Sequence, residues 1–258
     1  MGMGEPAWSQ LSADERLARR WSAFAAPGVE FVDEHARAEY AARAARLRSA
    51  ILLEGVPDRT PVCLLAGFYP GHSKGLTPYD AMHDYPRAAE AWYASNIELQ
   101  PDSLMAPLFA AVPGRAFEML DVRVLSWPGH GVAKEAGFQY NEQEWMREDE
   151  YDLLIDDPTD FLLHTWLPRT VAGMEGFASI GSPLDMIEVV AGPPYLMRWA
   201  DPAVQASLEK LAAAGREALE WGGTFYPLLG RLVASGFPGT IGAMSLAPFD
   251  VIGDILRG

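Results

Sequence analysis

Side chains that could bind an anion gather in the segment FYPGHSKGLTPYD, residues 68–80. His72 and Lys74 lie between glycines and can donate hydrogen bonds to a carboxylate or a phosphate, and Tyr79 and Asp80 follow them. The segment comes directly after an apolar run, and loops at the carboxyl ends of parallel strands carry the sites of barrels and doubly wound folds. These residues predict an anion-binding loop, although an ordinary solvated loop would have the same composition.

A second polar segment begins at WPGHG, residues 127–131, and continues to Phe138, Gln139 and Tyr140. Its glycines allow the backbone to turn tightly. Because the segment follows a predicted strand, His130, Gln139 and Tyr140 could line the rim of a polar site, and the alternative is a passive connection. The acidic run EDEYDLLIDD that follows indicates a solvated helix face, since its carboxylates are not grouped at metal-ligand spacing.

Asp102 follows Gln100 and Pro101 at the start of a predicted strand. Its carboxylate can either cap the loop backbone or project into the mouth of a barrel. The spacing alone favours the cap.

Several familiar catalytic patterns are missing from the sequence. The five histidines form no HExxH pair, and there is no GxSxG elbow, no Walker A loop and no Rossmann GxGxxG motif. Cys63 is the single cysteine, so the chain has neither an intrachain disulfide nor a CxxC metal site, and its place in an apolar run predicts a buried, inert thiol.

The composition predicts a globular protein with a substantial core, because 49% of the 258 residues are hydrophobic. A net charge of −15 argues against nucleic acid or an anionic membrane as a partner. The single cysteine suits a reducing compartment. We found no apolar signal-peptide core near the amino terminus and no run long enough to cross a membrane, so we expect a cytoplasmic protein.

Helical and strand patterns alternate along the chain. We predict helices from Ser12 to Pro27 and over residues 33–53, 86–99 and 203–221, and a further helix start at Asp157–Pro158. We predict strands over residues 61–68, 102–110, 122–127 and 239–245. The order of strand, loop, helix and strand indicates an α/β fold.

Three segments resemble the uroporphyrinogen decarboxylase superfamily, and more closely its divergent bacterial branch related to corrinoid-linked methyltransferases. They are LRSAILLEGVPDRTPVCLL, WPGHG after DVRVLS, and FQYNEQEWMREDEYDLLIDDPTDFLLHTWLPR. The resemblance covers residues 40–258 and matches the amino-terminal portion of a longer member. It implies an α/β fold of the (β/α)8 TIM-barrel family. Only about four strands are visible, so we expect a partial barrel in residues 58–258, preceded by an N-terminal helical extension in residues 1–57.

The resemblance also implies a function, the decarboxylation of a uroporphyrinogen-type tetrapyrrole. Asp102 stands five residues before Pro107, as does the family aspartate that contacts the pyrrole NH groups, and it becomes the candidate catalytic residue. The family's arginine-rich loop is replaced here by AGFYPGHSKG. The residues expected to contact the substrate are His72, Lys74, Tyr79, His130, Gln139 and Tyr140.

Two alternatives stay open beside the decarboxylase. The first is a corrinoid-dependent methyltransferase that works with a corrinoid protein. Its zinc ligands would lie beyond residue 258, so we expect no metal or cofactor within this chain. The second is an inactive half-barrel that pairs with another copy, and a homodimer is also a family-level expectation.

Overall fold

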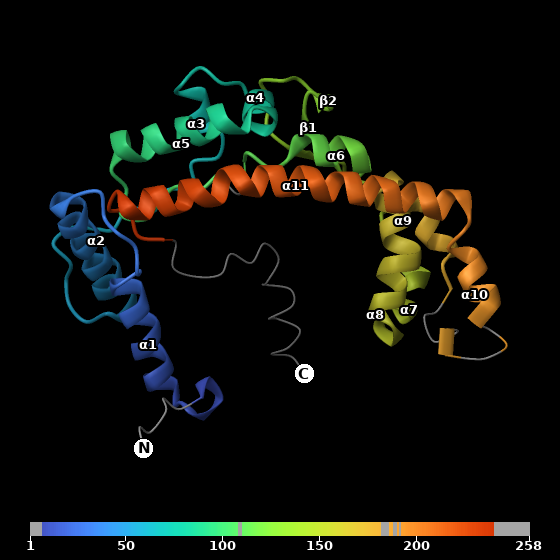
Figure 1. The fold of residues 1–258 in the computed structure, drawn as a ribbon, viewed down its shortest axis with the longest axis horizontal. Coiled ribbons are helices and arrows are strands. Elements are labelled where there is room, and N and C mark those ends of the chain that lie inside the picture. Colours follow the sequence, from blue (N-terminus) through green and yellow to red (C-terminus); the bar gives the residue numbers. More distant parts are fainter. Residues whose placement is uncertain (1–6, 108–109, 182–185, 188–189, 191, 240–258) are drawn as a thin grey trace. The chain divides into compact units, whose positions relative to one another are not determined.

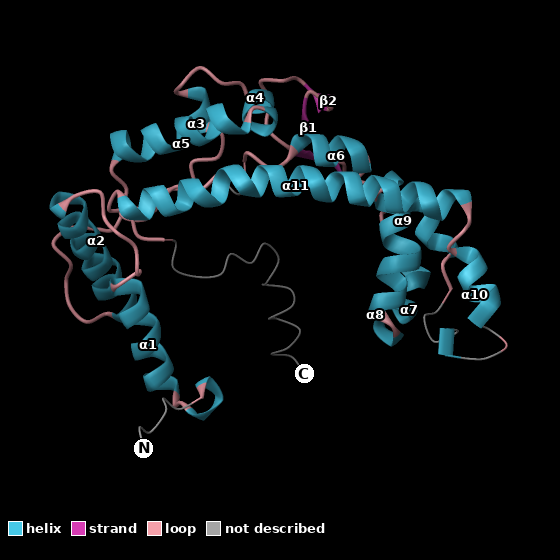
Figure 2. Cartoon of the chain, in the orientation of Figure 1, coloured by secondary structure: helices cyan, strands magenta, loops and turns pink. Residues whose placement is uncertain are grey.

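The computed structural model describes residues 7–107, 110–181, 186–187, 190 and 192–239. Helices dominate these ranges, which contain one sheet of three short strands (Figures 1 and 2). The α-helices are α1 (Ala13–Ala25), α2 (Glu34–Leu52), α3 (Tyr69–His72), α4 (Pro78–His83), α5 (Tyr85–Leu99), α6 (Gly114–Leu120), α7 (Tyr151–Asp156), α8 (Pro158–Phe161), α9 (Leu167–Thr170), α10 (Gly192–Arg198) and α11 (Pro202–Ala234). The strands are β1 (Leu125–Pro128), β2 (Gly131–Val132) and β3 (Gln139–Tyr140).

The chain forms two compact units. The described parts of unit 1 are residues 7–64, 100–104 and 229–239, and those of unit 2 fall within residues 65–99 and 105–228. Both units draw on separated stretches of the chain, whereas the sequence predicted one division at residue 57.

Helices α1 and α2 of unit 1 begin where their capping residues predict. Ser12 and Glu15 form a reciprocal capping box at the start of α1, and the Asp33 carboxylate accepts a hydrogen bond from the Ala36 backbone N–H at the start of α2. The buried Tyr40 of α2 then donates a hydrogen bond to the Phe24 carbonyl oxygen at 2.7 Å. Two helices that the sequence predicted are therefore confirmed, and an aromatic contact joins them.

Unit 2 is organised around α5 and α11. Helix α5 confirms the predicted helix at residues 86–99, and it buries Tyr85 and Trp92. The ring of Tyr85 meets that of Phe225 on α11 edge-on, with 6.1 Å between centroids. The hydroxyl of Tyr85 donates to the buried Glu217 carboxylate, which also accepts from Arg115 on α6.

The start of α8 at Asp157–Pro158 is also as predicted, with the Asp157 carboxylate accepting a hydrogen bond from the Asp160 backbone N–H.

The sheet has the order β2-β1-β3. β1 pairs parallel with β2 and antiparallel with β3, where Leu125 faces Tyr140 and Ser126 faces Gln139. β1 overlaps the predicted strand at residues 122–127 but begins three residues later. The sheet places Gln139 and Tyr140 beside the WPGHG turn.

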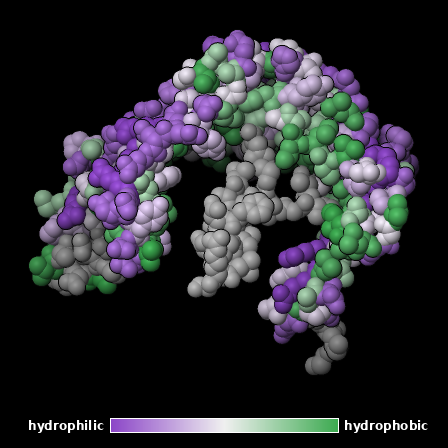
Figure 3. All heavy atoms as spheres, turned by 180° about the vertical axis from the view of Figure 1, so that it is seen from behind, coloured by the Kyte–Doolittle hydropathy of each residue, from purple (hydrophilic) through white to green (hydrophobic). Residues whose placement is uncertain are grey.

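The predicted strands at residues 61–68 and 102–110 are wrong where the structure describes them. Residues 61–66 run without regular structure, and so do residues 102–107 apart from bends. Val62 is 43% exposed and Leu65 is 78% exposed, so this apolar run is not covered on both faces. Figure 3 shows hydrophobic residues, drawn green, exposed at several places on the face of the molecule that it presents. A fully buried strand needs neighbouring strands on both edges. In the described chain Val62 instead bonds to Asp102 alone: its carbonyl oxygen accepts from the Asp102 backbone N–H at 2.8 Å, and its N–H donates to the Asp102 carboxylate.

Cys63, predicted to be a buried thiol, is exposed for the same reason. The predicted strand at residues 239–245 lies outside the described residues beyond Gly239. The small sheet and the many helices are compatible with the predicted α/β class. The predicted barrel is still a proposal.

Candidate functional site

The two segments that the sequence singled out as loops meet in unit 2. The backbone N–H of Tyr79 donates to the Lys134 carbonyl oxygen at 3.1 Å, and the ammonium of Lys134 lies 4.0 Å from the centroid of the Tyr79 ring. The rings of Phe68 and Phe138 lie 5.5 Å apart. We call the contact of residues 79, 83, 129 and 134 the Tyr79–Lys134 junction. It links the FYPGHSKGLTPYD segment to the WPGHG segment.

The first of these segments folds into two short helices rather than the loop that we predicted. Pro78 opens α4, and Thr77 and Asp80 cap it reciprocally, which fixes Tyr79 in the first turn. The Thr77 backbone N–H donates to the Asp80 carboxylate at 2.9 Å and lowers the pKa of Asp80, and the charge of Lys134 contributes in the same direction.

The close approach of the WPGHG turn depends on Gly129. Its φ of +82° is in the left-handed region, and a Cβ added there would come within 2.6 Å of the Tyr79 ring. Only glycine meets both conditions without strain. The turn therefore brings backbone against the Tyr79 ring.

His83 supports Tyr79 from the other side. The two rings stack with 3.9 Å between centroids. Nδ1 of His83 donates to the Tyr79 carbonyl oxygen at 2.8 Å, and Nε2 lies 2.9 Å from Oε1 of Glu118 on α6. Because both ring nitrogens face oxygen acceptors, the imidazole plane is fixed. Gly114 leaves the space for this ring, since a Cβ there would lie 2.5 Å from it.

His130 lies within the turn itself. Its ring stacks on the buried Trp127 with 4.0 Å between centroids, and its side chain is half-exposed. Nε2 of His130 is 3.9 Å from the Asp121 carboxylate. One face of His130 is thus supported by protein, and a flat ligand could stack on its exposed side.

The other predicted contact residues of unit 2 are placed differently. Gln139 and Tyr140 lie on β3 with exposed side chains. His72 is exposed at the end of α3, and the Lys74 ammonium pairs with the Glu98 carboxylate. Within the described part of the chain, none of these four residues contacts the Tyr79–Lys134 junction. Of the predicted residues, Tyr79 lies in the junction and His130 lies in the turn that contacts it.

Asp102 belongs to unit 1, where it is the centre of a buried ion cluster. Its side chain is 0% exposed. One carboxylate oxygen accepts from Arg46 and from Arg59, the latter at 2.8 Å, and the other accepts from Arg59 at 2.6 Å and from the Val62 backbone N–H at 2.7 Å. These four donors occupy the four acceptor positions of a carboxylate. A pyrrole N–H could bind only by displacing one of them.

The partners of Asp102 differ in exposure. Arg46 is buried on α2 and also binds the exposed carboxylate of Asp58, whereas the side chain of Arg59 is 46% exposed. Hydrogen bonds from Arg46 lower the pKa of Asp58 to about 2, and the same bonds raise the pKa of Arg46. The cluster ties residues 58–62 and Asp102 to α2. This outcome resembles the capping role that the spacing of Asp102 favoured.

Comparison with known proteins finds no matching family model, no matching curated protein and no matching solved structure. Within the described ranges, no group of three or more His, Cys, Asp or Glu side chains is arranged to hold a metal ion. None of the helices there is both long and apolar enough for a membrane crossing.

Two residues of the junction, His83 and Lys134, and the Glu118 partner of His83 were not predicted from the sequence. His83 is four residues after Tyr79, so their shared helix face could have been inferred from helical spacing. Lys134 and Glu118 had no comparable local signal, because their places depend on the packing of the turn and of α6 against α4.

Proposed function

We propose that this chain is part of a uroporphyrinogen-decarboxylase-like barrel protein, and that its Tyr79–Lys134 junction binds a carboxylate of a tetrapyrrole ligand. The family part of the proposal rests on the three sequence segments quoted above. The binding part rests on one observation, the exposed Lys134 ammonium held over the Tyr79 ring.

The chemistry of the junction suits such a ligand. In the described part of the chain, Lys134 has no ion-pair partner within 4 Å, so its charge is available to a carboxylate. His83 stacks on Tyr79 and restricts the motion of the Tyr79 ring, which supports this ammonium. Because the ring is already ordered, less conformational entropy is lost when a ligand binds. The half-exposed His130 offers a surface on which a pyrrole ring can stack.

Decarboxylation is the reaction that we propose for the ligand. The bond between a side-chain carbon and its carboxylate breaks, carbon dioxide leaves, and a proton is added to the carbon. Taken by itself within unit 1, the Asp102 carboxylate could accept from a pyrrole N–H only after losing a partner, and Arg59 would leave first, because it is half-exposed while Arg46 is buried. Corrinoid-dependent methyl transfer remains an alternative, to be decided by the assays below.

Binding is tested with uroporphyrin I, followed by its Soret absorption. We expect Lys134→Gln to weaken binding by about tenfold, the value of one charge-assisted hydrogen bond. Lys210→Gln is the matched control, because Lys210 is an exposed lysine of unit 2 on α11. Equal affinity of wild type and Lys134→Gln would remove the junction from the proposal.

The reaction is tested by incubating the protein anaerobically with uroporphyrinogen I and separating the products by their number of carboxylates. A parallel incubation with methylcobalamin tests methyl transfer. Loss of carboxylates supports the decarboxylase, and demethylation of the corrinoid without carboxylate loss supports the alternative. If the porphyrin binds but neither product forms, the protein binds a tetrapyrrole and catalyses neither of these two reactions.

A further inference from the structure

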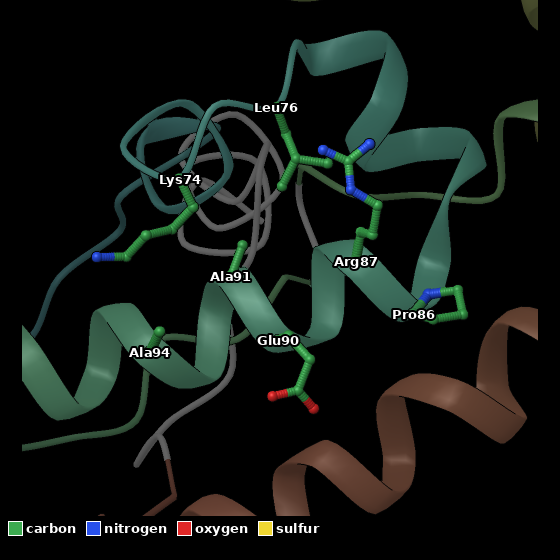
Figure 4. Close-up of a pocket in the computed structure, with 7 residues that line it drawn as sticks. All are labelled: Lys74, Leu76, Pro86, Arg87, Glu90, Ala91 and Ala94. Carbon is green, nitrogen blue, oxygen red and sulfur yellow. The ribbon is translucent and has the colours of Figure 1, made fainter.

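A second candidate site lies in unit 2, in a hollow between residues 74–76 and helix α5. The hollow has a volume of about 480 Å³ and is lined by Lys74, Leu76, Pro86, Arg87, Glu90, Ala91 and Ala94 (Figure 4). Its volume falls within the range of small-molecule sites, about 300–1,000 Å³. It shares no residue with the Tyr79–Lys134 junction.

The hollow combines an apolar floor with three charged lining residues, Lys74, Arg87 and Glu90. Leu76 and Ala91 are buried, and Ala94 continues the floor along α5. Lys74 and Arg87 lie on either side of Leu76 and Ala91 in Figure 4, whereas Glu90 points away from them.

The ion pairs formed by Lys74 and Arg87 differ in strength. Lys74 forms a close ion pair with Glu98. The guanidinium of Arg87 lies 3.7 Å from the Asp84 carboxylate, and both side chains are exposed. An exposed pair at this distance contributes little, so an incoming anion can replace Asp84 at small cost. The planar guanidinium can then bind a carboxylate through two parallel hydrogen bonds.

We propose that this hollow binds an amphiphilic monoanion, a compact apolar body that carries one carboxylate. The apolar body covers Leu76, Ala91 and Ala94, and the carboxylate binds Arg87, with Lys74 as a second cation. A highly charged ligand would gain little here, because Glu98 and Asp84 stand beside the two cations.

The test is calorimetric titration with 1-naphthoate and with its uncharged amide, 1-naphthamide. We expect one saturable site for naphthoate and binding of the amide that is about three- to tenfold weaker, since it lacks the charge-assisted contact. Arg87→Gln should weaken naphthoate binding by a similar factor and leave the amide unchanged. Ala94→Leu, which fills the floor, should weaken both ligands.

Two controls separate this site from the rest of the chain. Arg216→Gln removes another exposed arginine of unit 2 and should leave both affinities unchanged. Lys134→Gln should also leave them unchanged, so failure of the proposed tetrapyrrole site does not affect this result. Absence of saturable binding, equal affinity of Arg87→Gln and wild type, or an amide that binds as tightly as naphthoate would each overturn the proposal.

Discussion

Asp102→Asn separates a structural role of Asp102 from a catalytic one. Asp102 is fully buried and accepts four hydrogen bonds, three of them from guanidinium groups. Asparagine has the same shape but no charge, and its NH₂ group would face N–H donors. Arg46, which is buried, and Arg59, which is half-exposed, would both lose a charged acceptor.

The cost of this change can be worked from the exposure of the partners. Removing one member of a buried ion pair costs roughly 3–5 kcal/mol, because the other charge is left without compensation. Arg46 keeps the carboxylate of Asp58, and the half-exposed Arg59 can turn toward water, which reduces the loss. We therefore expect Asp102→Asn to lower the free energy of unfolding by about 3 kcal/mol.

Urea unfolding followed by circular dichroism measures this difference. Asp58→Asn is the matched control, because it removes another carboxylate that pairs with Arg46 but whose side chain is 66% exposed. We expect that variant to lose about 1 kcal/mol or less. An Asp102→Asn protein as stable as wild type would refute the buried-cluster reasoning. If such a protein also lost decarboxylation, Asp102 would be a catalytic residue held in place by other contacts.

Two further predictions follow from individual contacts. Hydrogen bonds from Arg169 and from the Arg147 backbone lower the pKa of Glu150 to about 2, so their stabilisation is present above the unfolded pKa near 4.5 and is lost as the pH falls toward 2. Urea midpoints of wild type should therefore fall more steeply between these pH values than those of Glu150→Gln, and parallel curves would contradict this. Gly129→Ala should cost about 1–3 kcal/mol through its positive φ and its contact with Tyr79, whereas Gly137→Ala, with open space around it, should cost little; equal melting temperatures would show that the turn tolerates a side chain.

The sequence by itself determined those elements whose signals are local. Ser12 and Asp33 mark the starts of α1 and α2 because each side chain satisfies backbone N–H groups of its own first turn. The Asp157–Pro158 pair marks α8 in the same way. Helix α5 was predictable from its pattern and α11 in part, since the structure extends α11 to Ala234, well beyond the predicted end at residue 221.

Tertiary structure decided whatever depended on partners distant in the sequence. The apolar run at residues 61–68 has the composition of a buried strand. A strand also needs neighbouring strands to pair with, and the composition of the run does not show whether they are present. Asp102 could be placed as a cap from its spacing, yet its two arginine partners lie 43 and 56 residues away. Lys134 meets Tyr79 only because Gly129 lets the turn approach the ring. Local hydrogen bonds depend on residues a few positions apart, so the sequence predicts them. The contacts that build both candidate sites depend on packing between segments that are distant in the sequence.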